Sequence, residues 1–229
     1  MVKKIHDSLR FKPSGIITHN RTVLAAMTNK QSHIDGRLSN DELNWLKRRA
    51  DGGFGIITTA AAHVSKNGQS WSGELGVFDD IHIDNLSKLS TNIHERKSLI
   101  IAQLFHGGIQ ADENLTGSIP ISASRIPSRL SKLGFSKKAS EKEIIQIIND
   151  FKDAAIRCFD AGFDGVEIHG AHGYLITQFL GTKTNLRSDR WGGDLDNRSR
   201  LLIEILKTIK FNLPENFIVG VRLSPEIEK

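Results

Sequence analysis

The sequence predicts an α/β protein whose parallel strands form a (β/α)8 barrel, or TIM barrel, with about the first five βα units present. Three observations favour this fold. Continuously apolar segments of strand length alternate with amphipathic helical segments, which is typical of a parallel sheet covered by helices. No Gly-x-Gly-x-x-Gly motif follows the first strand, which weakens the alternative of a doubly wound nucleotide-binding sheet. Polar side chains end several strands, as in barrel enzymes: Thr28, Gln103, His169 and Arg222.

Composition and charge restrict the class of protein. Hydrophobic residues make up 38% and charged residues 25% of the chain, which excludes disordered and low-complexity proteins. The net charge is +5, but lysine and arginine are spread along the chain, so we expect no nucleic-acid partner. No apolar run approaches the roughly 20 residues of a membrane helix and no signal peptide is visible. We therefore expect no membrane partner and a cytoplasmic location.

Five apolar segments predict the strands, at residues 24–28, 55–61, 99–104, 164–169 and 217–223. A complete barrel has eight strands in roughly 250 residues, so these correspond to about five-eighths of one. Two long connections use the remaining length, from about His106 to Ala139 and from about Gly170 to Asn197. Loops of this length are usually functional or disordered. We interpret residues 1–229 as a single partial barrel domain, with residues 1–22 as a lead-in segment.

Helices are expected between the strands. Ser39 is an N-cap with Glu42 three residues later, which predicts a capping box, and Ser140 with Glu143 predicts a second one. Gly162 closes the helix that Ser140 opens. The single cysteine, Cys158, lies on the apolar face of that helix and can form no internal disulfide. The four predicted helices present the apolar residues Leu43, Leu46 and Ala50; Leu86, Leu89 and Ile93; Ile144, Ile147, Ile148, Phe151, Ala154 and Ala155; and Leu202, Ile205, Leu206 and Ile209.

The densest group of reactive side chains follows the fourth strand. His169 and His172 stand three residues apart, and Tyr174, the only tyrosine, comes two residues later. If the segment turns helically, these side chains converge on one small ligand. Imidazole N–H groups polarise a carbonyl oxygen, and a phenol can donate a proton. The His-x-x-His spacing also suits a metal, with Glu167 or Asp189 as a third ligand, which leaves a metal-dependent barrel hydrolase as an alternative.

The chain resembles the old yellow enzyme family of FMN-dependent NAD(P)H:flavin oxidoreductases. The resemblance begins with His169 to Tyr174 and covers nearly the whole chain in the right order. Its other segments are residues 11–13, 20–28, 103–108, 185–193, 197–200 and 221–224.

The resemblance implies an FMN site. The backbone of Ala25, Ala26, Met27 and Thr28 would pass the flavin, with Thr28 near the O4/N5 edge. Ala61 would lie against the ring, or Ala60 if the register differs by one residue. Gln103 would hydrogen-bond the pyrimidine edge, and Arg222 would sit near N1/O2, where a cation favours the anionic reduced flavin. Without the resemblance, Gln103 could equally satisfy backbone at the barrel rim, and Arg222 could pair with Glu226.

The resemblance also implies the reaction. NADH or NADPH would pass a hydride to flavin N5, and the reduced flavin would deliver hydride to an activated, enone-type alkene. His169 and His172 would hold the carbonyl oxygen of this small-molecule substrate, and Tyr174 would donate the proton. No metal is implied. The remaining polar residues of the motif are expected to form a salt-bridged scaffold for the long loop: Arg187, Asp189, Arg198 and Arg200.

The strand count leaves a further alternative open. In the family, loops after the seventh and eighth strands hold the FMN phosphate, and this sequence contains five strands. The chain alone could therefore be a catalytically inactive truncated barrel, or an interaction module that uses its open sheet edges. Homo-oligomerisation is also open at this point.

Overall fold

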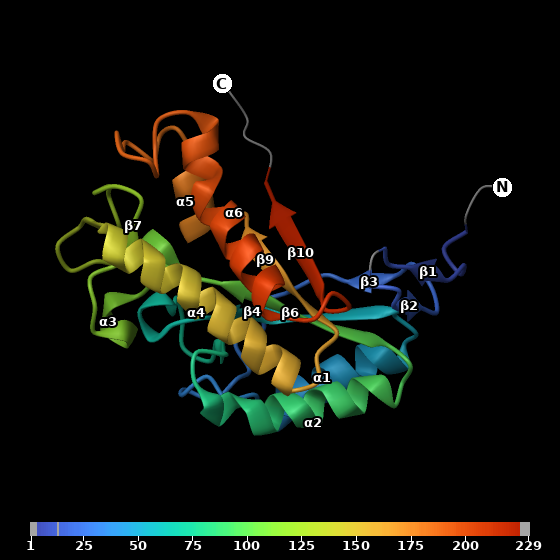
Figure 1. The fold of residues 1–229 in the computed structure, drawn as a ribbon. Helices are drawn as coiled ribbons and strands as arrows, with labels where there is room; N and C mark the ends of the chain where they lie inside the picture. The colour runs from blue at the N-terminus through green and yellow to red at the C-terminus, as the bar shows by residue number, and fades with distance from the viewer. Residues whose placement is uncertain (1–3, 13, 225–229) are drawn as a thin grey trace.

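The computed structural model of the protein describes residues 4–12 and 14–224. Its main sheet has six strands, all paired in parallel. Five of them follow the order β10-β9-β6-β4-β3, so consecutive strands of this path are neighbours in space, and the sixth, β5 (Leu75–Gly76), pairs with the end of β4. The long helices lie along one face of this sheet (Figure 1). This is a partial (β/α)8 barrel, as predicted, and the doubly wound alternative is wrong because the strand order never reverses. The five strands of the path are β3 (Val23–Leu24), β4 (Ile56–His63), β6 (Leu99–Phe105), β9 (Gly165–Gly170) and β10 (Ile218–Leu223).

The first strand is shorter than predicted. The ladder between β3 and β4 joins Val23 to Ile56 and Leu24 to Ile57, and residues 25–28 continue outside any strand. The prediction of a strand over 24–28 is therefore wrong beyond Leu24. Apolar residues continue in this segment without pairing, so its backbone groups stay open at the rim of the sheet.

A bulge interrupts the second strand. Thr58 pairs with Ile101 and Ala61 pairs with Gln103, so β4 contains one residue more than β6 between these two pairs. The Thr59 hydroxyl accepts a hydrogen bond from the Gln103 amide at 3.2 Å, which occupies the gap in the ladder. The bulge places Ala61, rather than Ala60, beside Gln103 in the register of the two strands.

Four long helices connect the strands, as predicted: α1 (Asn40–Asp51), α2 (Ile83–His94), α4 (Glu141–Asp160) and α6 (Leu195–Asn212). The capping box of Ser140 and Glu143 is confirmed. The predicted capping box of Ser39 and Glu42 is wrong in part, because only one of its two hydrogen bonds forms. Ser39 accepts from the Glu42 amide, but the Glu42 carboxylate turns inward and accepts from Asn29 and Ser32 instead. Burial of Glu42 under this loop raises the pKa of its carboxyl group.

The core fills the space between the sheet and the helices. Alternate strand residues such as Ile100 and Ile168 face the helices and are fully buried against residues such as Leu89, Phe151 and Ile205. Cys158 belongs to this core, and burial raises the pKa of its thiol to about 12. No helix among residues 4–12 and 14–224 is long and apolar enough to cross a membrane.

Short elements order the long connections. β1 and β2 form an antiparallel pair within the predicted lead-in segment, β5 pairs with the end of β4, and β7 pairs with β8 in the connection after β6. Both long connections therefore carry defined structure. These elements are β1 (Leu9–Arg10), β2 (Ile17–Thr18), η1 (Lys66–Gly68), β5 (Leu75–Gly76), η2 (Asp80–His82), η3 (Gly108–Gln110), α3 (Glu113–Thr116), β7 (Ile121–Ser122), β8 (Lys137–Lys138) and α5 (Leu175–Leu180).

Candidate active site

The inner face of the sheet, which points away from the helices, collects the predicted polar residues. Gln103 on β6 pairs in register with Glu167 on β9, and His169 on β9 pairs with Arg222 on β10. Residues at alternate positions of a strand share a face, so Glu167 and His169 point to the same side. The neighbouring residues Val166 and Ile168 point to the helices and are fully buried.

Glu167 joins two of these residues through hydrogen bonds. Gln103 Nε2 donates to Glu167 Oε1 at 2.6 Å. Arg222 donates to the same carboxylate through Nε at 2.9 Å and through Nη2 at 3.3 Å. The partner of Arg222 is thus Glu167, while Glu226, the alternative partner, lies outside the described residues. Sequence reasoning considered Glu167 only as a metal ligand, although its position two residues before His169 already placed it on the same face.

The two histidines contact each other directly. His169 Nε2 lies 3.2 Å from His172 Nδ1, and the ring centroids are 4.9 Å apart. The Ala171 amide donates to His169 Nδ1 at 3.3 Å, so Nε2 of His169 carries the proton and donates to His172. Burial, together with the charges of His172 and Arg222, lowers the pKa of His169 to about 4. His169 is therefore neutral at physiological pH.

A tight turn, rather than a helical turn, brings the three side chains together. His169 is the next-to-last residue of β9, His172 lies in the turn with a φ of 57°, and Tyr174 is the N-cap residue of α5. The helical turn that was the stated condition for convergence is absent, but the three side chains converge all the same. The left-handed backbone of His172 is uncommon for a residue with a side chain and folds its ring back toward His169.

Tyr174 packs against rings from two strands. Its ring meets His169 edge-on at 5.0 Å between centroids and Phe105 at 4.9 Å. Trp71 stacks on Phe105 with 5.5 Å between the ring centroids. Burial raises the pKa of Tyr174, and the negative charge of Glu74 raises it further, so the phenol stays protonated at neutral pH. The sequence pattern assigned no site role to Phe105 or Trp71, although Phe105 follows Gln103 by two residues on the same strand.

The predicted flavin-facing backbone lies at the rim of this face. Met27 is 44% exposed, and the backbone of residues 25–28 makes no hydrogen bond to any other described residue. Ala61 is buried and stands beside Gln103 in the register. Three features fit the flat, polar ring of a flavin. They are the unpaired backbone amides of residues 25–28, the small side chain of Ala61, and the Arg222 cation opposite the Gln103 amide.

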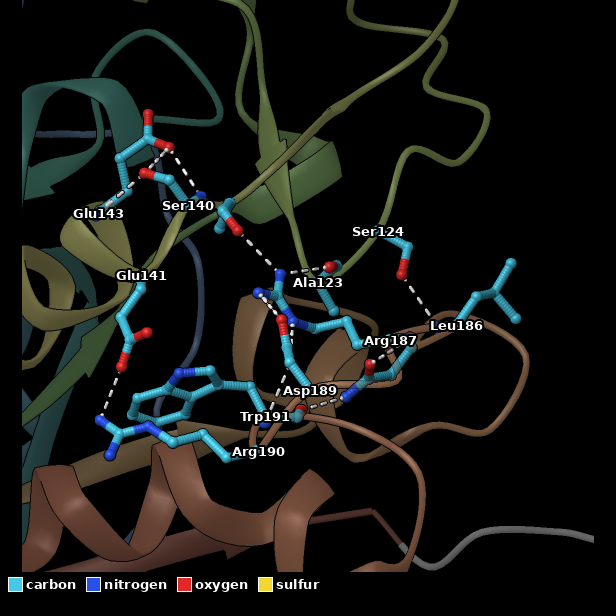
Figure 2. Close-up of polar contacts among 12 residues, drawn as sticks. Ala123, Ser124, Ser140, Glu141, Glu143, Leu186, Arg187, Asp189, Arg190 and Trp191 are labelled. Atoms are coloured by element: carbon cyan, nitrogen blue, oxygen red, sulfur yellow. Dashed lines mark hydrogen bonds and ion pairs between the residues drawn. The ribbon is translucent and has the colours of Figure 1, made fainter.

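Arg187 anchors the loop between α5 and α6 to the connection that precedes α4. Its side chain is only 3% exposed; Nε and Nη2 donate to the two Asp189 oxygens at 2.9 and 2.7 Å. Nη1 donates to the carbonyl groups of Ala123 and Ala139 in the preceding connection (Figure 2). The predicted scaffold is therefore confirmed for the pair of Arg187 and Asp189.

Two other arginines of the motif act differently from the prediction. Arg198 donates to the carbonyl oxygens of Leu180 and Gly193, and Arg200 donates to Arg190 and Asn197. These contacts hold the loop through neutral acceptors, so the expectation of salt bridges is wrong for both. Carbonyl oxygens at the end of α5 and in the loop are within reach, whereas Asp189 is already occupied. No group of three or more His, Cys, Asp or Glu side chains that could hold a metal ion occurs in the part of the chain that the structure describes.

The fold and the site together define a barrel protein with a polar inner face suited to a flavin. Residues 9–228 match the model of the NADH:flavin oxidoreductase / NADH oxidase family. The chain belongs to this family, which includes the old yellow enzymes.

Several curated relatives share this similarity. A probable NADH-dependent flavin oxidoreductase of Bacillus subtilis is 37% identical over 98% of this chain and 60% of its own length. An NADH:acrylate oxidoreductase of Vibrio harveyi is 36% identical over 96% of this chain and 22% of its own length. The chain thus spans less than two thirds of the length of each of these relatives.

Solved structures show the same relation. The old yellow enzyme homologue from Zymomonas mobilis superposes with a TM-score of 0.90 at 28% identity, covering 97% of this chain and 64% of that one. Morphinone reductase in complex with tetrahydroNAD also gives a TM-score of 0.90, at 25% identity, covering 99% of this chain and 65% of that one.

Proposed function

We propose that this chain carries the flavin-facing and substrate-facing residues of an oxidoreductase that uses FMN and NADH or NADPH to reduce an activated alkene. The observation that carries the proposal is the set of contacts that His169 makes with His172 and Tyr174. Gln103 and Arg222, which both hydrogen-bond to Glu167, lie beside this group on the same face of the sheet. When bound, FMN would supply a centre that accepts hydride from the nicotinamide and delivers it to the alkene.

Two side chains of the inner face would hold the pyrimidine edge of the flavin. Gln103 offers both an amide donor and an acceptor, and Arg222 offers a fixed positive charge. The cation would stabilise negative charge at this edge. Ala61 leaves room beside Gln103, and the unpaired backbone of residues 25–28 would donate to the opposite edge.

The histidines would orient the substrate. Because His169 donates its Nε2 proton toward His172, the neutral tautomer of His172 has its proton on Nε2, where it can donate outward. A carbonyl or carboxylate oxygen placed at this pair would be polarised, which draws electron density from the conjugated double bond. Relatives named for acrylate and fumarate act on double bonds that are conjugated to such an oxygen.

Tyr174 would supply the proton that completes the reduction. Its phenol remains protonated at neutral pH because burial and Glu74 raise its pKa. Its edge-on packing against His169 and Phe105 restricts the orientation of the ring next to the histidine pair.

The first test is an absorption spectrum of the purified chain with added FMN. We expect protein-bound flavin that NADH or NADPH bleaches anaerobically and that 2-cyclohexenone then restores. Tyr174→Phe should keep the bleaching and slow the restoration at least tenfold, in line with the usual contribution of a general acid. A colourless chain that oxidises no NADH or NADPH would contradict the proposal and favour the inactive interaction module.

A further inference from the structure

Glu167 is the charged residue of the inner face that has no role in the proposed function. Its carboxylate lies on β9 between Gln103 on β6 and Arg222 on β10, and it hydrogen-bonds to both. We propose, on the basis of the proposed function, that Glu167 is a positioning residue. It orients Gln103 and Arg222 before FMN binds, and it limits how strongly Arg222 favours the reduced flavin.

The first part of the proposal follows from hydrogen-bond chemistry. An ionised carboxylate only accepts hydrogen bonds, so the atom of Gln103 that faces Glu167 must be the amide nitrogen. A glutamine whose neighbours can both donate and accept hydrogen bonds can exchange the positions of its amide nitrogen and oxygen at little energetic cost. Glu167 removes this freedom, and the Gln103 carbonyl oxygen is left to face a donor from a ligand.

The second part follows from the geometry at Arg222. Nε donates to one oxygen of Glu167 and Nη2 to the other, so the planar guanidinium group is held as a fork at a fixed angle. Arginine side chains have several rotatable bonds, and fixing one before the ligand arrives removes an entropic cost from binding. The remaining N–H groups of Arg222 make no hydrogen bond to another residue in the described part of the chain.

The third part follows from charge. The side chains of Arg222 and Glu167 are 36% and 20% exposed, so water screens their charges only in part. Taken together the pair is neutral, and a bound anion experiences less attraction than it would from Arg222 alone. Removing the charge of Glu167 should therefore favour the anionic reduced flavin over the oxidised form.

The test compares wild type with Glu167→Gln, which keeps the size of the side chain and removes its charge. Glu204→Gln is the matched control, because Glu204 lies on α6 and contacts Lys207 at 3.2 Å between exposed side chains. The first measurement is hydrogen exchange at Arg222 Nε by NMR on the cofactor-free chain, assigned with Arg222→Lys. The second is the dissociation constant of FMN in its oxidised and reduced forms.

We expect the Arg222 Nε proton of wild type to exchange at least tenfold more slowly than that of Arg129, which is exposed and has no hydrogen-bond partner in the described chain. Glu167→Gln should reduce this protection, because a neutral amide oxygen accepts more weakly than a carboxylate, and should shift the ratio of the two FMN dissociation constants about tenfold toward the reduced form. Glu204→Gln should change neither.

Rapid exchange at Arg222 in wild type would overturn the inference without any variant. An unchanged ratio of dissociation constants in Glu167→Gln would also overturn it. If wild type binds no FMN, the proposed function fails instead, and the exchange measurement still decides whether Glu167 holds Arg222.

Discussion

Replacing Arg187 by alanine should destabilise the protein strongly although the residue touches none of the proposed substrate-facing groups. The substitution removes four hydrogen bonds, two to Asp189 and two to the carbonyl oxygens of Ala123 and Ala139. The Asp189 carboxylate is 44% exposed and can be solvated by water. The two carbonyl groups belong to buried residues, and each buried group left unpaired costs about 1–3 kcal/mol.

The expected loss in the free energy of unfolding is therefore about 2–6 kcal/mol, from two buried carbonyl groups left unpaired at about 1–3 kcal/mol each. Arg190→Ala is the matched control, because Arg190 lies in the same loop and its pair with Glu141 has side chains that are 60% and 56% exposed (Figure 2). Exposed pairs contribute about 0–1 kcal/mol. Comparing two arginines of one loop separates the effect of burial from that of charge.

Urea unfolding followed by circular dichroism measures both variants, and limited proteolysis of the native state reports opening of the loop over residues 181–194. Arg187→Ala should shift the unfolding midpoint far more than Arg190→Ala and should make the loop easier to cleave. Equal midpoints for the two variants, with equal cleavage, would refute the reasoning from buried carbonyl groups.

Three further predictions concern single contacts. His94 Nε2 donates a hydrogen bond to Asp164 Oδ2 at 2.8 Å, which raises the pKa of His94. The stabilisation should therefore be complete below the unfolded pKa near 6.5 and lost as pH rises through the higher folded value. Comparing urea unfolding of wild type and His94→Gln at low and high pH checks this; because His94 is 42% exposed, we expect about 0.5 kcal/mol, and an equal difference at both pH values would contradict it. Ser140→Ala breaks the capping box with Glu143 and should lower the free energy of unfolding by about 1 kcal/mol, measured in urea; no change would show that the box contributes nothing. Absorbance near 295 nm should titrate Tyr174, the only tyrosine, above the ordinary pKa of 10, and a lower midpoint would contradict its burial beside Glu74.

Much of the fold could be predicted because buried parallel strands and amphipathic helices leave strong local patterns. The face of α4 is an example, since its predicted apolar residues from Ile144 to Cys158 are all buried. The segment after Leu24 shows where local pattern fails. It is as apolar as a strand, but pairing depends on a neighbour across the sheet, and the β4 ladder ends at that residue.

The candidate site was predicted where residues are close in sequence and only partly where they are not. His169, His172 and Tyr174 lie within six positions, and the structure brings them together. The hydrogen bonds of Glu167 reach Gln103 and Arg222, which lie 64 and 55 residues away in the sequence on other strands. No local sequence pattern specifies these partners. Glu42 illustrates a related limit, because its spacing from Ser39 suits a capping box but its carboxylate binds Asn29 and Ser32, 13 and 10 residues earlier in the chain.

The extra residue in β4 has a consequence for how this strand tolerates changes of length. A regular strand counted inward from Thr58 would direct Ala60 to the inner face and Ala61 to the helices, whereas the bulge restores Ala61 and His63 to the side of Gln103 and Phe105. Deleting one residue at position 59 or 60 would give an unbroken ladder and keep every later side chain on its present side. Deleting one residue at position 57, before the bulge, would instead move Ile56 out of register. The strand thus has one place where a codon can be lost without turning the inner face outward.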